Sequence, residues 1–390
     1  MKELTNPPYK CIISLTLVKT FIISLHIYGV TNKMNINGKE LAHGIIQGGM
    51  GVGVSLSELA GNVAKQGCMG VISSVNIGFK EPDFLKNPFE ANIRALKEHI
   101  RRAKEISGGN GLIGVNIMVA VSHYSETVKA AISAGADAII SGAGLPLKLA
   151  ELVKNSDTLF APIVSSKKAA LLLCKTFSQK NGVLPDFIVI EGHKAGGHLG
   201  FSKENLMEDT CQDNLQILKE VLEVIKPFEE KFQKKIKVFL GGGIFTGKDM
   251  ADAIKAGADG VQMGTRFIAT DECDASDVFK KVIVDSKPED IRIIKSPVGM
   301  PARAVYTPLL QGLDKGKTFF ADKCSACLTA CPKGDKIPYC ISRALIAAVN
   351  GNYEEGLFFC GENASRVKEI MPVKKLINEL LSDCNAALAR

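Results

Sequence analysis

KAGADGVQMGTRF, residues 255–267, decides the fold class of this 390-residue chain. The segment contains the end of a helix, an Ala-Gly-Ala-Asp turn, a short apolar strand and a second glycine turn. SAGADAII, residues 133–140, repeats the first part of this pattern. A repeated step from helix to strand predicts parallel strands connected by helices.

Eight short apolar runs have the length and composition of buried strands. They cover residues 44–47, 69–72, 112–116, 138–140, 159–164, 187–190, 237–240 and 260–263. Apolar residues at helical spacing lie between them at 57–66, 91–106, 124–134, 147–153, 166–177 and 247–256. Eight such units predict an α/β fold, a (β/α)8 TIM barrel. The rival is a doubly wound sheet, but GGMGVGVS at 48–55 lacks the G-x-G-x-x-G spacing of its dinucleotide turn.

Three parts of the chain are expected. Residues 34–310 would form the barrel, with an inserted helical segment at about 203–234, and residues 311–390 a mostly helical, cysteine-containing extension. Residues 11–30 are largely apolar but carry a lysine, Lys19, which is costly inside a membrane span. We therefore interpret residues 1–33 as an extension upstream of a natural start at Met34 rather than as a membrane anchor.

Composition excludes some classes of protein. A net charge of +7 is mild for this length, and no basic stripe with interleaved aromatic residues is present, so a nucleic-acid partner is not expected. The eleven cysteines are an odd number, and most stand alone, which favours reduced thiols in the cytoplasm over a disulfide framework.

Chemistry-bearing residues follow the predicted strands, at the end where TIM barrels place their active sites. After the sixth strand comes EGHKAGGHLGF, residues 191–201. The pair Gly196-Gly197 lets a flat ligand approach the backbone, and His198 can exchange protons near neutral pH. In isolation, the same residues would describe a glycine-rich turn with a surface histidine.

Glycine turns also follow the seventh and eighth strands. LGGGI at 240–244 and MGTRF at 263–267 each lead toward a helix N-terminus, and Thr265 adds a hydroxyl. Backbone N–H groups in such a pair of turns can hold a phosphate. The two turns together predict a phosphate-bearing ligand.

These motifs carry a family resemblance. QGGMGVGVS, EGHKAGGHLGF, LGGGI, GVQMGTRF and SPVGMPAR together resemble the nitronate monooxygenase (2-nitropropane dioxygenase) family, which includes an FMN-dependent enoyl-ACP reductase. The resemblance covers about residues 35–304, and it implies an FMN-binding TIM barrel with His198 as the catalytic residue. The predicted FMN-binding residues are Gln47, Gly48, Met50, Asn116, Glu191, Gly196, Gly197, Gly242, Gly243, Gln262, Met263, Gly264 and Thr265.

Two positions depart from the family pattern. Glu191 stands where many members carry glutamine, and a carboxylate donates a hydrogen bond only when it is protonated. His193 stands where members tend to carry proline or another residue, and we expect it to be an exposed loop residue rather than a second acid or base.

The resemblance implies an oxidoreductase with two alternative reactions. The first is oxidation of an alkyl nitronate to a carbonyl compound and nitrite with O2, and the second is NAD(P)H-dependent reduction of an enoyl thioester. We favour the first because it is the broader family label, although both reactions would use the same residues. A non-catalytic flavin-binding protein would need no proton-transferring His198. The expected partners are a small-molecule substrate and O2 or NAD(P)H, and a homodimer is an open alternative.

Two later motifs remain. SPVGMPAR at 296–303 is expected to close the barrel mouth, with anion binding by Arg303 as the alternative. Cys324, Cys327, Cys331 and Cys340 lie within seventeen residues. Their spacing matches neither a ferredoxin nor a zinc ribbon, so we assign no metal, and an iron–sulfur or metal site stays the alternative to buried thiols.

Overall fold

The computed structural model describes residues 33–319, 323–331 and 336–390. The apolar segment at residues 11–30 lies outside these ranges. Within them, no helix combines the length and the apolar character that crossing a membrane requires.

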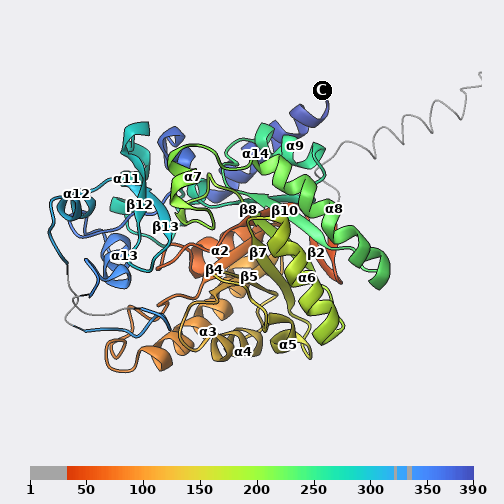
Figure 1. The fold of residues 1–390 in the computed structure, drawn as a ribbon, viewed down its shortest axis with the longest axis horizontal. Helices are drawn as coiled ribbons and strands as arrows, with labels where there is room; N and C mark the ends of the chain where they lie inside the picture. The colour runs from red at the N-terminus through yellow and green to blue at the C-terminus, as the bar shows by residue number, and fades with distance from the viewer. Residues whose placement is uncertain (1–32, 320–322, 332–335) are drawn as a thin grey trace, which may run out of the picture.

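Eight parallel strands close into a barrel in the order β10-β11-β3-β4-β5-β6-β7-β8. Figure 1 shows the strands inside a ring of helices. The predicted (β/α)8 barrel is confirmed, and each predicted strand agrees with an observed one to within one or two residues at either end. The strands are β3 (Ile45–Gln47), β4 (Met69–Ser73), β5 (Leu112–Met118), β6 (Ala138–Gly142), β7 (Leu159–Val164), β8 (Phe187–Glu191), β10 (Lys237–Gly241) and β11 (Gly260–Met263).

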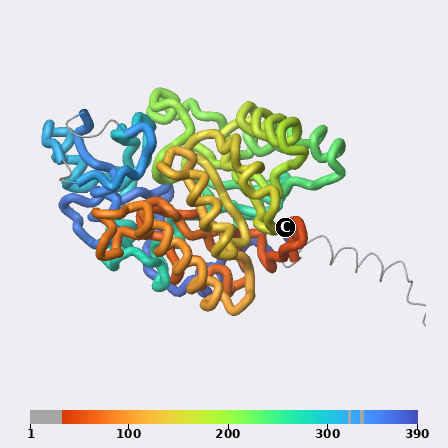
Figure 2. Tube along the Cα trace, turned by 90° about the horizontal axis from the view of Figure 1, so that it is seen from below, coloured from red at the N-terminus to blue at the C-terminus, as the bar shows by residue number. Residues whose placement is uncertain are grey.

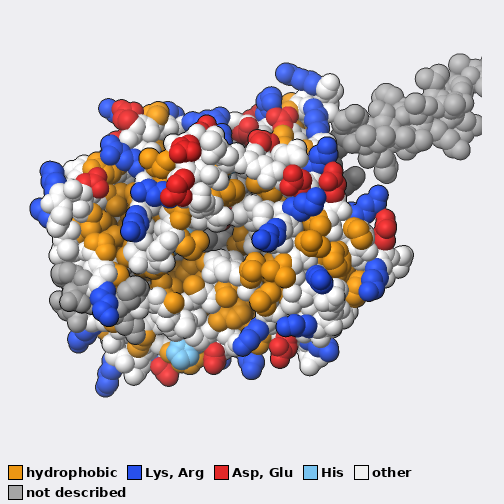
Figure 3. All heavy atoms as spheres, in the orientation of Figure 1, with side chains coloured by type: hydrophobic (Ala, Val, Ile, Leu, Met, Phe, Trp, Pro, Cys, Tyr) orange, Lys and Arg blue, Asp and Glu red, His pale blue; other side chains and the backbone are white. Residues whose placement is uncertain are grey.

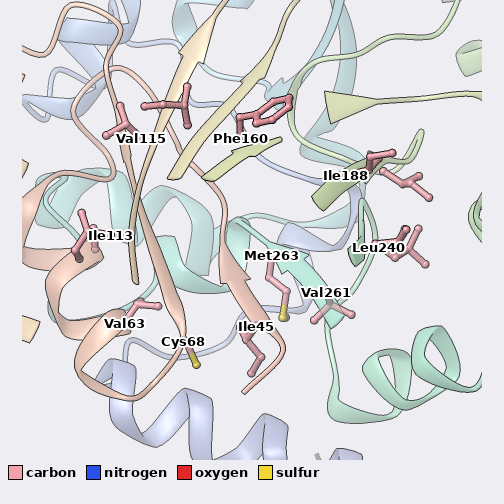
Figure 4. Packing of buried hydrophobic residues seen from close by; sticks show 14 of the residues in the cluster. Ile45, Val63, Cys68, Ile113, Val115, Phe160, Ile188, Leu240, Val261 and Met263 are labelled. Atoms are coloured by element: carbon pink, nitrogen blue, oxygen red, sulfur yellow. The ribbon is translucent and has the colours of Figure 1, made fainter. Parts of the chain in front are cut away.

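The strands are apolar on both faces because both faces are buried. Successive side chains of a strand point to opposite sides. Ile188 of β8 therefore packs beneath the helices, whereas Val189 packs in the barrel interior. Figure 4 shows residues of this outer layer, which include Val63 and strand residues such as Ile113 and Ile45. This arrangement explains the continuous apolar runs in the sequence.

Helices connect consecutive strands. They are α2 (Ser57–Lys65), α3 (Pro88–Ser107), α4 (Tyr124–Ser133), α5 (Leu149–Val153), α6 (Lys167–Asn181), α8 (Asn214–Phe232) and α9 (Gly247–Lys255), with the short α7 (Lys203–Met207) before α8. The expected insertion at 203–234 is smaller than predicted. Helix α8 packs on α6, and its Leu218 and Val221 belong to the main core, so α8 is a regular barrel helix and only the segment around α7 is additional.

The last helix of the chain, α14 (Val373–Leu388), completes the barrel. It packs between α9 and α2, and its Leu376 and Leu380 join the main core. Gly247 of α9 permits this close approach, because a Cβ there would lie 2.6 Å from the Cβ of Asp383. The predicted division after residue 310 therefore does not separate α14 from the barrel.

Most of the remaining segments gather at one end of the molecule, where the cyan and light blue part of the tube lies in Figure 2. They contribute a three-stranded antiparallel sheet in the order β12-β13-β9. Their elements are β9 (Gly197–His198), α10 (Thr265–Ile268), α11 (Asp277–Asp285), the 3-10 helix η1 (Pro288–Asp290), β12 (Ile291–Lys295), β13 (Pro301–Val305), α12 (Pro308–Asp314), α13 (Ile341–Val349) and the 3-10 helix η3 (Glu362–Arg366).

The opposite end of the barrel is held by aspartates that precede strands. Asp259 donates its backbone N–H to the Val238 carbonyl, and its carboxylate accepts the Val238 N–H at 2.9 Å. Asp137 makes the same reciprocal pair with Ile113. The Ala-Gly-Ala-Asp motif thus ends a helix and fixes the start of the neighbouring strand. A hairpin of β1 (Met34–Ile36) and β2 (Lys39–Leu41) covers this end of the interior.

Basic and acidic side chains are interspersed over the face shown in Figure 3, without a stripe of one sign. All ten cysteines of the described residues are free thiols.

Candidate active site

A cavity of about 580 Å³ lies at the carboxyl ends of the strands. His198 lines it, as does every residue predicted to bind the cofactor except Gln47. Segments far apart in the sequence therefore meet here, as the barrel topology requires.

Gln47 is the exception because its amide is used inside the barrel. The side chain is fully buried, its oxygen accepts the Val71 N–H at 3.1 Å, and its nitrogen donates to the Gly48 carbonyl. It joins β3 to β4 instead of facing the cavity, so its assignment as a ligand-binding residue is corrected.

The two glycine turns lie side by side, and their amides are available. Gly242 and Gly243 have φ values of 87° and 93°, which favour glycine. Their carbonyls accept hydrogen bonds from the side chains of Asn214 and Asn363, respectively. Among the described residues, the N–H groups of Gly243 and Gly264 donate to no acceptor. Because hydrogen bonds hold the carbonyls in place, the unpaired N–H groups of the same turns keep a fixed orientation. Such N–H groups can bind an anion.

The neighbouring helix termini contribute less than predicted. The N-terminus of α9 is closed by a capping box, in which Thr246 and Asp249 satisfy each other's backbone N–H groups. Helix α10 has only four residues. The anion-binding groups are therefore the loop amides and the Thr265 hydroxyl, which accepts the Gly361 N–H at 2.8 Å and keeps its own proton to donate.

A basic side chain that the sequence analysis did not assign accompanies the turns. Lys194 lines the cavity, and a Cβ on Gly243 would lie 3.1 Å from its Cβ. Its ammonium forms a half-exposed ion pair with Glu362 at 3.5 Å. Only the fold shows that Lys194 adjoins the glycine turns, because residues 194 and 243 are distant in sequence.

Glu191 and Gln262 face the cavity from the ends of β8 and β11. Neither side chain has a hydrogen-bond partner among the described residues. Burial raises the pKa of the Glu191 carboxyl to about 7, so the protonated form is populated near neutral pH. A protonated carboxyl can donate a hydrogen bond as an amide does, so Glu191 can replace the glutamine that many family members carry.

His198 is held by the small sheet at the mouth. Strand β9 pairs with β13, which places His198 opposite Ala302. The His198 Nε2 lies 2.8 Å from the Ser296 hydroxyl, and its ring meets Phe359 edge-on at 5.3 Å. Burial lowers the pKa of His198 to about 4, so the imidazole is neutral at physiological pH.

In this region the expectation for His193 was wrong, and the alternative role of Arg303 in anion binding is not supported. His193 is buried with 8% of its surface exposed and packs against Phe201, because the loop after β8 folds inward instead of outward. Arg303 does not present its guanidinium to an anion from solution. It is buried and donates to the carbonyls of His193 and Ala195 at 2.7 and 2.6 Å, so it fixes the glycine loop that carries His198. The segment before it does line the mouth, through Val298 and Met300.

The C-terminal third of the chain supplies part of the cavity wall, which the sequence analysis missed. Ile341, Leu345, Phe359 and Cys360 line the cavity beside the barrel loops. Gly196 is required at this contact, because a Cβ there would lie 2.5 Å from the Cys360 carbonyl carbon. No local pattern in the sequence indicates that these residues return to the barrel mouth.

Comparison with known proteins identifies the family of this chain. The profile of the family described as nitronate monooxygenase matches residues 33–383. The chain belongs to the nitronate monooxygenase family. Members of this family are flavin-dependent oxidoreductases, so the predicted enzyme class is confirmed.

Individual relatives are distant. A probable nitronate monooxygenase of Staphylococcus saprophyticus is 23% identical over 310 residues, which span 73% of this chain and 80% of the relative. A probable nitronate monooxygenase of Staphylococcus aureus is 28% identical over 130 residues, 33% of this chain and 34% of the relative.

Solved structures share the fold. FabK from Thermotoga maritima superposes with a TM-score of 0.67 and 26% identity, covering 90% of this chain and 94% of FabK. A nitroalkane oxidase from Streptomyces ansochromogenes gives a TM-score of 0.65 at 20% identity, covering 89% of this chain and 96% of the other.

Proposed function

We propose that this member of the family is an FMN-dependent nitronate monooxygenase that oxidises alkyl nitronates to carbonyl compounds and nitrite with O2. The observation that carries the proposal is a neutral, oriented His198 beside a glycine-backed cavity with a separate anion-binding end. The family match and the names of the staphylococcal relatives support it.

The cavity fits FMN at both of its ends. The free amides of Gly243 and Gly264, with Thr265 and Lys194 beside them, suit a terminal phosphate. Gly196 and Gly197 leave room for a flat ring against the backbone, and Glu191 and Gln262 offer polar groups without other partners. When bound, FMN would accept electrons from the substrate and deliver them to oxygen.

The protein's own contribution is placement and proton transfer. A neutral imidazole accepts a proton, so His198 can convert a neutral nitroalkane into its nitronate by removing a proton from the carbon next to the nitro group. A nitronate supplied directly has already lost this proton, and His198 would then only hold and orient it. Ser296 restricts the rotation of the imidazole, and Phe359 covers one of its sides. The loop that carries Val298 and Met300 narrows the access of water to the reacting carbon.

A second candidate function is reduction of an enoyl thioester. The observation that favours it is the apolar wall from the C-terminal region, Ile341, Leu345 and Phe359, which suits an acyl chain better than a small nitronate. The chain also shares its fold with the enoyl reductase domain of MlnA, at a TM-score of 0.62 and 14% identity.

Product analysis with FMN-loaded protein separates the two functions. Nitronate oxidation predicts nitrite and a carbonyl compound from a short-chain nitronate in air, with no need for a nicotinamide. Enoyl reduction predicts NADH or NADPH consumption that depends on crotonyl thioester. Thioester-dependent consumption without nitrite would overturn the proposal.

We also propose that the enzyme works in the cytoplasm, since its ten described cysteines are unpaired. The reductant, if one is used, would be NAD(P)H, and a homodimer is proposed as an assembly to be tested by light scattering.

A further inference from the structure

We propose that Cys324, Cys327, Cys331 and Cys340 ligate an iron–sulfur cluster at the edge of the flavin cavity. The proposal does not depend on which substrate the enzyme uses. It begins with the observation that all four cysteines line one small cavity next to the main one. The other walls of this small cavity are mostly apolar, including Val298, Leu328 and Ile341.

The loop from Cys324 to Cys327 has the backbone of a sulfur-binding turn. Ala326 has a φ of 50°, which is uncommon for a residue with a side chain. In this conformation its N–H donates to the Sγ of Cys324 at 3.4 Å. Backbone N–H groups in turns of alternating handedness surround many iron–sulfur sites, and hydrogen bonds to sulfur stabilise the thiolate.

The four cysteines are a chemically suitable ligand set, because all of them line the same small cavity. Cysteine binds metal as the thiolate, and iron in a cluster supplies the positive charge that four neighbouring thiolates need.

The arrangement favours a cluster over a single ion. A zinc ion requires four ligands at about 2.3 Å from one point. Among the described residues, no group of three or more cysteine, histidine or carboxylate side chains could hold one metal ion. In a cluster, each cysteine can bind a different iron, so the sulfurs surround a larger body without converging.

The site is attached to the barrel at the mouth. The Ser122 N–H donates to the Cys327 carbonyl, and the Thr329 N–H donates to the Ala120 carbonyl, both at 3.1 Å. These bonds fix the cysteine loop on the segment after β5. Cys327 and Leu328 line both cavities, so a cluster would lie against the cavity that holds the flavin.

The test is metal analysis of the full chain purified without air, followed by reconstitution with ferrous iron and sulfide. We expect iron and acid-labile sulfide in equal amounts. After dithionite reduction we expect a paramagnetic resonance signal, which a fully reduced flavin does not give. Cys327→Ser and Cys340→Ser should lose most of the iron. Cys174→Ser, on the buried face of α6, should keep it.

Several results would overturn the proposal. They are stoichiometric zinc, absence of iron and sulfide after reconstitution, a disulfide between two of the four cysteines in the anaerobic protein, or full iron content in both serine variants. Flavin content and circular dichroism establish that the variants are folded. If Cys327→Ser does not fold, the exposed Cys324 gives a second variant, Cys324→Ser, with the same expected loss of iron.

Discussion

The two ends of the barrel are built from different residues for different tasks. At the amino ends of the strands, Asp137 and Asp259 bind the backbone of neighbouring strands, and their carboxylates have protein partners. At the carboxyl ends, Glu191 and Gln262 have no partner among the described residues, and Gly243 presents a free amide. Satisfied polar groups stabilise a fold, whereas unsatisfied groups around a cavity are available to a ligand. Substitutions at the two ends should therefore separate stability from catalysis.

The largest effect is expected at the carboxyl end, from His198→Ala. Loss of the proton-accepting imidazole should lower the turnover of a neutral nitroalkane by about 10²–10⁴-fold. The melting temperature should change little, because among the described residues the His198 ring makes a hydrogen bond only with Ser296. Steady-state nitrite formation and thermal melting measure the two quantities.

His123→Asn is a matched control for this change. His123 is exposed, lies outside the cavity and has a φ of 61°, which asparagine tolerates. It should keep wild-type turnover. An equal loss of activity in both variants would remove the special role of His198.

At the amino end, Asp259→Ala should lower the free energy of unfolding by about 1–3 kcal/mol, because the buried Val238 N–H loses its acceptor. Turnover per folded molecule should stay unchanged. Asp252→Ala, on the exposed face of α9, should stay within about 0.5 kcal/mol of wild type. Chemical denaturation measures both, and a loss of turnover in Asp259→Ala at full folding would show that the two ends are coupled.

Gly243→Ala tests the anion-binding turn. A side chain at a φ of 93° costs about 1–2 kcal/mol, and its Cβ would press on Lys194. We expect FMN affinity to fall about tenfold, measured by flavin fluorescence titration. Gly316→Ala has a comparable φ of 79° but open space around it, so it should lose stability without losing FMN affinity. If wild type, Gly243→Ala and Gly316→Ala bound FMN with equal affinity, the phosphate would not bind at the Gly243 turn.

The smallest effect is a pH dependence from Glu191. The carboxyl has a pKa of about 7 in the folded protein, so it gains negative charge beside the flavin as the pH rises through 7. The flavin reduction potential should therefore fall more steeply with pH around 7 in the wild type than in Glu191→Gln.

The same carboxyl affects stability. Its folded pKa lies above the unfolded value, so the folded state holds the proton more tightly and stability decreases as the pH rises from about 4.5 to 7. The difference in stability between Glu191→Gln and wild type should therefore shift in favour of the variant when the pH is raised from 5 to 8. If wild type and Glu191→Gln gave parallel curves of potential against pH, and parallel curves of stability against pH, Glu191 would not titrate in this range.

Local patterns predicted most of the barrel because its strands and turns are set by nearby residues. Apolar runs such as 187–190 and stops such as Gly257 determine where a strand or a helix ends. The carboxyl-end position of Glu191, His198 and Gly243 follows from topology alone.

The residues that sequence reasoning misplaced depend on contacts between distant segments. Gln47 faces inward because Val71 of the next strand needs an acceptor. His193 is buried because Arg303, 110 positions later, holds its carbonyl. Helix α14 occupies the eighth helix position although a long segment separates it from β11. Such pairings leave no periodic signal in the sequence.

Anaerobic mixing of FMN-loaded protein with a short-chain alkyl nitronate tests the central claim most directly. We predict that the nitronate alone bleaches the yellow flavin absorbance in a single turnover and that admission of O2 restores it, with nitrite formed. Flavin that stays oxidised with the nitronate but is bleached by NADH would contradict nitronate oxidation as the function of this site.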